Sequence, residues 1–554
     1  MTTDIHLDYL SEQLGPQGHP TSFQLRCPDH FNFAYDVVDR LASLSPERRA
    51  LRWSDDQGGR ADYSFADLAE LSDRAASFLS DLGIGPGDRV MLALRRQAEF
   101  WWVILGLHKI GAVAAPATHL LKAEDLVYRF EQAEVAAVLA TSQGGLADEI
   151  DQACAQLRRP PLKLSSPGQR PGWIDFAAGL AAAGPWDRPR QAPSLTDPML
   201  LYFTSGTTGA PKMVTHDFSY PIAHLPTAKY WQKVESDSLH LTVSDTGWGK
   251  AVWGKLYGQW LMEACVDVYD FDHFDPAGLL DHLVEAEVTS FCAAPTVYRF
   301  LIGCDLAAWD LSRLRHCSIA GEAMNPVVYE TFRQRTGLEL KEAFGQTETT
   351  AVVMTPHWLE TKAGSMGQPS PAYQVALLTP DGSEAEPGQE GEICLRTDAG
   401  RPLGLFAGYL GDPELTAQVW HDGYYHTRDL AVQDKDGYLW YVGRVDDMIK
   451  TSGYRVSPFE VESVLLRHPA VRECAVTGVY DELRGLAIKA TIVPHDGFSP
   501  TDELARQIQS FVKQRTAPYK YPRQVEFVTA LPMTVSGKVR RAEIRRRDEA
   551  LTAV

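Results

Sequence analysis

The stretch YFTSGTTGAPKMV, residues 202–214, predicts a buried strand that runs into a loop of hydroxyls and glycines ending at one lysine. Glycine backbone, hydroxyl donors and a cation in this order are suited to holding phosphates. No Gly-Lys-Ser/Thr closes a G-x-x-x-x-G frame, which excludes the loop of P-loop NTPases. A plain Gly/Thr hairpin is the alternative interpretation. The residues predicted to contact phosphate are Thr204, Ser205, Gly206, Thr207, Thr208, Gly209 and Lys212.

Short apolar runs alternate with helical patterns around this loop, which predicts an α/β fold with parallel sheets. The pattern at 65–83 is helical and ends in glycine, as a helix C-terminus would. Segment 159–198 is rich in Pro and Gly, so we expect an irregular connection there. From about Gly364 short β-like runs dominate, and from about Asp446 a small α+β module follows. The predicted strands are 89–94, 136–141, 199–205, 290–295 and 316–322.

The composition limits the functions that the chain can have. With 554 residues it is long enough for several packed units, and its formal net charge of −19 opposes binding to nucleic acid or anionic membranes. Eight scattered cysteines show no CxxC pair and no zinc-site spacing, so we expect reduced thiols, mostly in the core. The acidic N-terminal sequence fits neither a signal nor a transit peptide, and no apolar run reaches the roughly 18 residues of a membrane span. These features predict a cytoplasmic enzyme.

Further motifs follow the loop in a fixed order: GEAMNP at 321–326, FGQTETT at 344–350, YYHTRDLA at 424–431, GRVDDMIKTSGYRVSPFEVE at 443–462 and PMTVSGK at 532–538. With them the chain resembles, over nearly its whole length, the adenylate-forming superfamily of acyl-CoA synthetases, luciferases and adenylation domains. The resemblance implies an α/β fold in which a large N-terminal domain, residues 1–445, combines αβ-layered subdomains with a β-rich one. A small mobile α+β domain, residues 446–554, would carry a catalytic lysine.

The same resemblance assigns the ATP site. Glu348 would supply an oxygen ligand to Mg²⁺, beside Gln346 and Thr347 at the phosphates. Asp429 and Arg444 would bind the ribose. Each of these residues taken singly is more often an ordinary salt-bridge or surface group. The remaining positions expected in the ATP site are Gly321 and Glu322, bordering adenine and acyl group, and Arg455, near phosphate.

Lys538 resembles the lysine that bridges the acyl carboxylate and the α-phosphate as pyrophosphate leaves. With Thr204 and Glu348 it completes the set expected to be catalytic. Asp446 matches the family's hinge, about which the C-terminal domain would rotate between two half-reactions. The sequence before Lys538, proline followed after four residues by Gly-Lys, resembles sites where lysine acetylation switches such enzymes off. A lysine acetyltransferase is therefore an expected partner.

Rotation would bring the TSGYR loop to the adenylate, with Ser452, Gly453 and Tyr454 around the pantetheine arm of CoA. Arg484, Lys513 and Arg523 are candidates for its nucleotide end by their position in the family. The alternative for these three is that they are solvated basic side chains.

The strings CPDHFNFAYDVVD and SDTGWGKAVWGKLYGQWLMEACV resemble the medium-chain acyl-CoA synthetase branch, close to acetyl-CoA synthetases. Trp248, Gly321 and Gly345 are the predicted acyl pocket. Acetate-specific relatives carry tryptophan at the position of Gly345, so a longer fatty or an aromatic acid is expected. Lys250 and Lys255 add cations near this pocket, which leaves a polar or dicarboxylic acid open, or they are surface residues.

The expected activity is ATP-dependent carboxylate–CoA ligation through an acyl-adenylate, with ATP, Mg²⁺ and CoA as cofactor and co-substrates. One alternative is an adenylation enzyme that loads a carrier protein or stops at the adenylate, although no carrier domain follows Lys538. A second is a nucleotide-binding scaffold without catalysis, against which stand Lys212, Glu348, Asp429, Arg444 and Lys538 together. The basic tail 539–547 lacks interleaved aromatics, so it predicts a solvated helix face rather than a nucleic-acid site.

Overall fold

The computed structural model describes residues 2–142, 144–189, 193–204, 211–451, 454–481, 484–533 and 539–552. The chain divides into two compact units, which are described separately. Unit 1 comprises residues up to Thr204, Pro211–Gln374 and Arg396–Tyr424. Unit 2 comprises Val375–Leu395 and the chain from Tyr425 onward. The functional boundary predicted at residue 446 falls inside unit 2 and stays a prediction.

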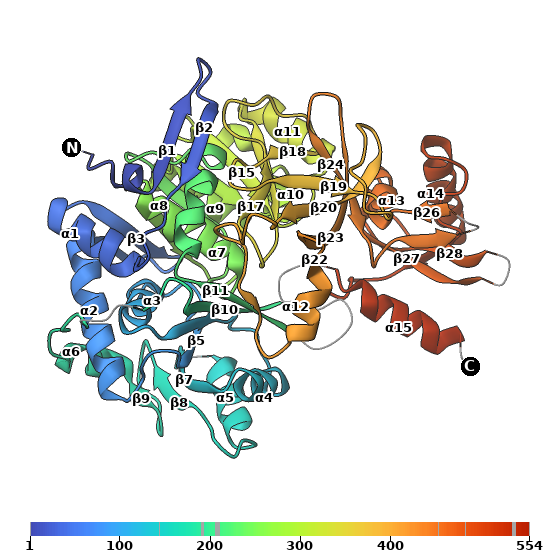
Figure 1. Cartoon of the computed structure of the whole chain (residues 1–554). Coiled ribbons are helices and arrows are strands. Elements are labelled where there is room, and N and C mark those ends of the chain that lie inside the picture. The colour runs from blue at the N-terminus through green and yellow to red at the C-terminus, as the bar shows by residue number, and fades with distance from the viewer. Residues whose placement is uncertain are drawn as a thin grey trace. The chain divides into compact units, whose positions relative to one another are not determined.

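Unit 1 contains an eight-stranded sheet in the order β21-β11-β10-β6-β5-β7-β8-β9. Its strands are parallel from β10 to β9, and β10 and β11 form an antiparallel hairpin. Helices α4 and α5 lie beside it in the lower part of Figure 1, and their apolar side chains share one core with those of its strands. The strands are β5 (Arg89–Ala93), β6 (Val113–Pro116), β7 (Val135–Ala140), β8 (Leu162–Ser165), β9 (Ile174–Asp175), β10 (Pro198–Thr204), β11 (Lys212–Asp217) and β21 (Gly408–Tyr409). The helices are α2 (Phe65–Asp81), α3 (Glu99–Ile110), α4 (Ala123–Gln132), α5 (Gly145–Cys154) and α6 (Phe176–Ala182).

A second set of unit 1 strands follows the order β18-β17-β16-β15-β14-β12-β13-β3-β4, parallel from β16 to β3. The core beside it is formed with α9, α10 and α11. The strands are β3 (Arg49–Asp55), β4 (Arg60–Ser64), β12 (Leu239–Thr242), β13 (Cys265–Asp270), β14 (Ser290–Ala293), β15 (His316–Ala320), β16 (Leu340–Gly345), β17 (Ala351–Met354) and β18 (Ser365–Pro369). The helices are α7 (Gly249–Gly254), α8 (Tyr257–Leu261), α9 (Pro276–Glu285), α10 (Pro295–Leu301) and α11 (Pro326–Thr336). Unit 1 also contains β1 (Leu10–Leu14), β2 (Pro20–Leu25), α1 (Arg40–Leu44), α12 (Pro413–Val419) and β22 (Trp420–His421).

Unit 2 combines antiparallel strands in the order β19-β20-β23-β24 with a five-stranded sheet on which α13 and α14 pack. The first group is β19 (Val375–Leu378), β20 (Glu390–Arg396), β23 (Tyr424–Gln433) and β24 (Leu439–Arg444). The second group is β25 (Ile449–Thr451), β26 (Tyr454–Val456), β27 (Val471–Asp481), β28 (Gly485–Pro494) and β29 (Gln524–Phe527). The helices are α13 (Pro458–Leu465), α14 (Asp502–Arg515) and α15 (Arg541–Thr552).

These elements confirm the α/β prediction, and each apolar run chosen from the sequence is a strand: β5, β7, β10, β14 and β15. The helix predicted at 65–83 is α2, which begins at a capping box formed by Ser64 and Asp67. Segment 159–198 was wrongly expected to be only an irregular connection. It contains α6, and its strands β8 and β9 extend the eight-stranded sheet, because β8 pairs in parallel with β7 and β9 pairs in parallel with β8. These strands are short and lie among Pro and Gly residues, so hydrophobic periodicity did not predict them.

The eight cysteines are all free thiols, and six of them are buried, as predicted. Among the described helices, none has the length and apolar character needed to cross a membrane. The basic tail forms α15, where Arg541 pairs with Glu462, Arg545 with Asp447 and Arg547 with Glu526. Carboxylates of unit 2 therefore neutralise much of the tail's charge.

Candidate active site

The predicted phosphate loop begins and ends in the hairpin of β10 and β11. Thr204 ends β10, Lys212 begins β11, and the two residues are paired across the hairpin. The Lys212 ammonium lies 5.2 Å from the centre of the Tyr409 ring, a cation–π distance. Ser205, Gly206, Thr207, Thr208 and Gly209 lie outside the described residues.

The Gln-Thr-Glu turn follows β16 and is fixed by contacts from the neighbouring sheet. Tyr409 donates its hydroxyl to the Glu348 carboxylate at 2.8 Å. The Phe406 backbone amide donates to the carbonyl of Glu348, also at 2.8 Å. Within the turn, the backbone amide of Gln346 donates a hydrogen bond to Thr349 Oγ1 at 3.0 Å. The carboxylate predicted to hold Mg²⁺ is thus buried and held in one orientation.

His216 on β11 also holds this turn. Its Nε2 lies 2.7 Å from the Thr347 carbonyl, and burial lowers the pKa of His216 to about 4. The ring is therefore neutral at pH 7, and Nε2 carries the hydrogen because a carbonyl can only accept. Sequence reasoning missed His216 and Tyr409. Their signal was weak, since His216 lies just beyond the end of the phosphate-loop motif and Tyr409 lies in a strand without a motif.

Gly321 and Glu322 directly follow β15, beside the end of β16, so they lie at the same carboxyl edge of parallel strands as Gly345. Gly321 has φ +103°, a conformation that favours glycine. The Glu322 carboxylate accepts a hydrogen bond from Thr296 Oγ1 at 3.0 Å, just after the end of β14. In open α/β sheets ligands bind at this edge. The GEA turn lies at this edge, and its contact with adenine and the acyl group stays a prediction.

The predicted acyl residues gather at the same edge. Trp248 is half-buried and precedes α7, and the next residue, Gly249, approaches Thr347: a Cβ on Gly249 would lie 3.8 Å from Thr347 Cγ2. A Cβ on Gly345 would lie 2.3 Å from the Thr350 carbonyl oxygen and 2.5 Å from Trp253 Cη2. Trp253 therefore already fills the space next to Gly345. The sequence-based prediction of the acyl pocket did not include Trp253.

The two lysines of this segment have different environments. Lys250 donates to the carbonyl of Ala320 at 2.8 Å, so its ammonium lies next to Gly321. Lys255 is only 2% exposed and donates to the Ser244 carbonyl at 2.9 Å. Burial lowers the pKa of Lys255 to about 7. The alternative that Lys255 is a surface residue is therefore wrong, because its ammonium is enclosed by the core.

The two residues predicted to bind the ribose lie in unit 2. Asp429 on β23 and Arg444 on β24 are cross-strand partners, with 3.4 Å between Arg444 Nη1 and Asp429 Oδ2. Tyr441 donates its hydroxyl to Asp429 Oδ1 at 3.0 Å. Burial tends to lower the pKa of Arg444, but Asp429, Tyr441, Asp446 and Asp447 together outweigh it, and the net shift is upward. The Asp429 side chain is buried, whereas that of Arg444 is 30% exposed.

The remaining predicted residues of unit 2 occupy separate environments. Asp446 lies 3.7 Å from Arg428, whose φ is +62°. Tyr454 is 51% exposed and stacks on Tyr519 with ring centres 4.0 Å apart. Arg455 lies 3.9 Å from Glu390. Ser452, Gly453 and Lys538 are outside the described residues, although Met533 and Val539, which flank the lysine loop, form an antiparallel bridge.

The three cations proposed for the CoA nucleotide also differ. Arg484 is paired with Asp481 at 3.2 Å. Lys513 and Arg523 both lie over the Tyr521 ring, at 5.5 and 4.8 Å from its centre, and Arg523 Nη1 donates to the Tyr521 hydroxyl at 2.7 Å. Lys513 and Arg523 thus share one aromatic residue, whereas Arg484 already has a carboxylate partner.

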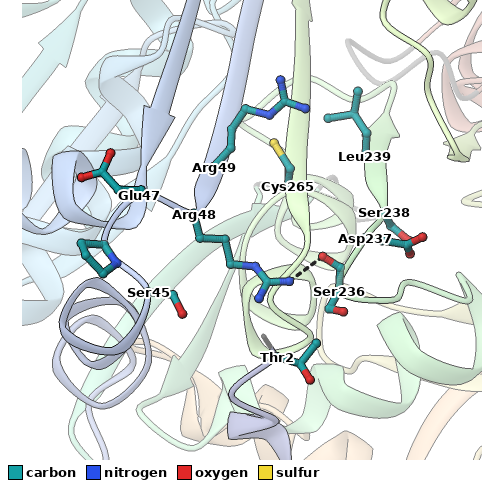
Figure 2. A pocket seen from close by; sticks show the side chains of 11 residues that line it. Thr2, Ser45, Glu47, Arg48, Arg49, Ser236, Asp237, Ser238, Leu239 and Cys265 are labelled. Atoms are coloured by element: carbon teal, nitrogen blue, oxygen red, sulfur yellow. Dashed lines mark hydrogen bonds between the residues drawn. The ribbon is translucent and has the colours of Figure 1, made fainter.

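A cavity of about 670 Å³ opens elsewhere in unit 1 (Figure 2). It is lined by the first residues of β3, β12 and β13, namely Arg49, Leu239 and Cys265. Arg48 crosses its base and donates to the Ser236 carbonyl at 2.6 Å, the dashed line in Figure 2. Because it lies at the amino ends of parallel strands, opposite the edge where ligands bind, we do not assign it to catalysis.

Gly345→Ala tests the tight approach of the turn. A methyl group cannot be placed 2.3 Å from a backbone carbonyl, so β16 or the turn must move. We expect the free energy of unfolding to fall by about 1–3 kcal/mol, as for other overpacked sites. Urea unfolding measures it. Gly85→Ala is the matched control, since open space surrounds that position and its φ is ordinary. Equal stability of both variants would show that the turn is loose.

Two family descriptions match the chain: "AMP-binding enzyme" over residues 38–410 and "AMP-binding enzyme C-terminal domain" over residues 460–538. The human mitochondrial acyl-coenzyme A synthetase ACSM5 is 39% identical, over 94% of this chain and 90% of the relative. An anthranilate CoA ligase solved with anthranoyl-AMP has a TM-score of 0.86 at 26% identity, over 95% of this chain and 99% of that one. A benzoate CoA ligase from Burkholderia xenovorans has a TM-score of 0.82 at 27% identity, over 93% and 100%. The chain therefore belongs to the AMP-binding enzyme family, among its acyl-coenzyme A synthetases.

Proposed function

We propose that this AMP-forming acid–thiol ligase acts on a medium-chain fatty acid or an aromatic carboxylic acid. The reaction has two steps. The acid and ATP give acyl-AMP and pyrophosphate, and acyl-AMP and CoA then give acyl-CoA and AMP. The proposal on the acid is supported by Trp253, an aromatic side chain that lies beside Gly345 and would form a wall of the acyl pocket. Names of similar proteins include anthranilate and benzoate ligases.

The observation that carries the ATP half of the proposal is the contact chain Lys212–Tyr409–Glu348. One tyrosine contacts the phosphate-loop lysine through its ring and the Glu348 carboxylate through its hydroxyl. Tyr409 thus contacts both a cation and an anionic metal ligand. This pair suits a magnesium–polyphosphate complex, because hard carboxylate oxygen is the ligand Mg²⁺ prefers. When bound, the ion would neutralise phosphate charge; Glu348 would orient it and Lys212 would add a second positive charge.

Roles in unit 2 are proposed on the same basis. Asp429 and Arg444 would hold the ribose, Arg455 would lie near phosphate, and Asp446 would be the hinge. Lys538 would neutralise the charge that develops as pyrophosphate leaves, and Thr204 would help to hold the phosphates. Ser452, Gly453 and Tyr454 would line the pantetheine path, while Arg484 and Lys513 would meet the CoA nucleotide. Acetylation of Lys538 would remove its charge and stop adenylation.

A cytoplasmic location is proposed from the eight free cysteines, since disulfides are rare in reducing compartments. The curated relatives carry the word mitochondrial in their names. Imaging of the tagged full-length chain in its own cell decides between the two locations. Labelling confined to a membrane-bounded organelle would contradict the proposal.

A panel of acids tests the proposed substrate class. Butyrate, hexanoate, octanoate, benzoate, a hydroxybenzoate and a dicarboxylate are each supplied with ATP and Mg²⁺, and pyrophosphate release is measured. CoA is then added and the thioester is followed. We expect the highest kcat/KM with a six- to eight-carbon or an aromatic acid, following about 0.8 kcal/mol per buried CH₂. Preference for the dicarboxylate would instead implicate Lys250, and adenylate without thioester would favour the carrier-loading alternative.

A further inference from the structure

Three metal-binding side chains of unit 2 converge on one point between neighbouring strands. Glu392 and Cys394 are alternate residues of β20 and therefore project from the same face, and His426 lies on the adjacent strand β23. One ligand atom from each, a carboxylate oxygen, Sγ and a ring nitrogen, lie within 4.8 Å of one another. Residues 392 and 426 are far apart in sequence, so no metal-binding spacing motif predicts these three ligands.

Two neighbours approach the same ring nitrogen of His426. Its Nδ1 lies 3.4 Å from Cys394 Sγ and 3.2 Å from Glu392 Oε2. A ring nitrogen carries either one hydrogen or one lone pair, so it cannot both donate to the carboxylate and accept from the thiol. A cation placed among the three atoms would interact favourably with every one of them.

The distances fit the edges of a zinc tetrahedron. Bond lengths of about 2.3 Å to sulfur and about 2.1 Å to nitrogen and oxygen give S···N and N···O edges of about 3.6 and 3.4 Å at tetrahedral angles. The observed 3.4 and 3.2 Å are each within about 0.2 Å of these edges. The octahedral, all-oxygen preference of Mg²⁺ does not match a thiol and an imidazole.

The surroundings orient the ligands and leave access to them. The Arg428 backbone amide donates to Glu392 Oε1 at 2.7 Å, which holds the carboxylate with Oε2 toward His426. Such outer contacts are usual at metal sites. Cys394 is buried, whereas the side chains of His426 and Glu392 are 15% and 21% exposed, so an ion can enter from the solvent side.

We propose that Glu392, Cys394 and His426 bind one zinc ion, with water as the fourth ligand, at a site distinct from the Mg²⁺ of ATP. The inference concerns unit 2 alone and does not depend on the substrate of the enzyme. Because a folded site binds the ion and an unfolded chain loses this geometry, Zn²⁺ also raises the melting temperature of the protein.

The test uses the full-length protein after treatment with EDTA and removal of the chelator. Zn²⁺ is titrated against a chromophoric chelator in the presence of millimolar Mg²⁺, and Co²⁺ is added to a second sample. We expect one equivalent of tightly bound Zn²⁺ per chain and, with Co²⁺, the intense visible bands of a tetrahedral site together with a thiolate-to-cobalt charge-transfer band. Absence of a stoichiometric equivalent would overturn the proposal.

Cys394→Ser and His426→Asn identify the ligands. Each should weaken Zn²⁺ binding at least about a hundredfold and Cys394→Ser should remove the charge-transfer band. Cys474→Ser is the matched control, because Cys474 is another buried thiol of unit 2, and it should keep the full equivalent. If Cys394→Ser does not fold, as judged by thermal unfolding without zinc, the half-buried His426→Asn decides. Unchanged binding in the folded variants would place the ion elsewhere and refute the site.

Discussion

Lys538→Ala should lower the rate of acyl-adenylate formation by about 10²–10³-fold, the usual cost of removing one group that stabilises developing charge. Thioester formation from supplied acyl-adenylate and CoA should stay within about threefold of the native rate, because that half-reaction does not require the lysine in the proposed two-state cycle. Pyrophosphate release measures the first half-reaction. The disappearance of synthetic acyl-adenylate into acyl-CoA measures the second.

Arg540→Ala is the matched control for Lys538→Ala. Arg540 is two residues away, exposed, and paired with Glu543 at 3.0 Å, so its removal changes the local charge by the same amount. Both half-reactions should survive in this variant. Equal loss of both half-reactions in Lys538→Ala would contradict the assignment of the lysine to adenylation alone. Mass spectrometry of the native enzyme, with activity assayed before and after acetyltransferase treatment, tests acetylation separately.

Glu348→Gln should lower adenylation at least about a hundredfold and shift the Mg²⁺ dependence to higher concentrations. Metal stabilisation of transition-state charge is worth several kcal/mol, and each 1.4 kcal/mol corresponds to tenfold in rate. The amide oxygen of glutamine can still accept from Tyr409, which protects the fold while the negative charge is lost. Adenylation rates over a Mg²⁺ titration measure the effect.

Tyr409→Phe separates orientation from charge. This variant keeps the ring under Lys212 and loses only the hydroxyl that donates to Glu348. A hydrogen bond to a charged group contributes about 1.5–3 kcal/mol, so we expect the adenylation rate to fall about ten- to a hundredfold, less than in Glu348→Gln.

A native Mg²⁺ dependence in Glu348→Gln would mean that another carboxylate holds the metal.

Several central strands could be predicted from the hydrophobic pattern, because a buried parallel strand needs an unbroken apolar run. Runs such as those at β5 and β14 met this condition. Strands β8 and β9 did not, since they are short strands in a Pro- and Gly-rich segment. Strand β8 depends on pairing with β7 and strand β9 on pairing with β8, and a local window of sequence does not show pairing partners.

Some residues of the candidate site were likewise predicted from the sequence and others were not. Glu348, Asp429 and Arg444 were found because each lies within a dense motif. Tyr409 and Trp253 were not, because single aromatic residues in apolar segments look like core packing. They matter only through what is next to them: Glu348 and Lys212 for the tyrosine, Gly345 for the tryptophan.

By itself, the sequence determined the α/β class and the family and predicted a phosphate loop from Thr204 to Lys212, because these depend on residue order along one strand, turn or motif. Tertiary structure alone decided that Lys255 is buried, that Tyr409 joins Lys212 to Glu348, and that Cys394 meets His426 and Glu392. The physical reason is that a side chain's charge state and ligands depend on neighbours supplied by distant strands. Cys394 shows this most clearly: it was predicted to be core filler, and the neighbouring strand β23 places an imidazole 3.4 Å from its sulfur.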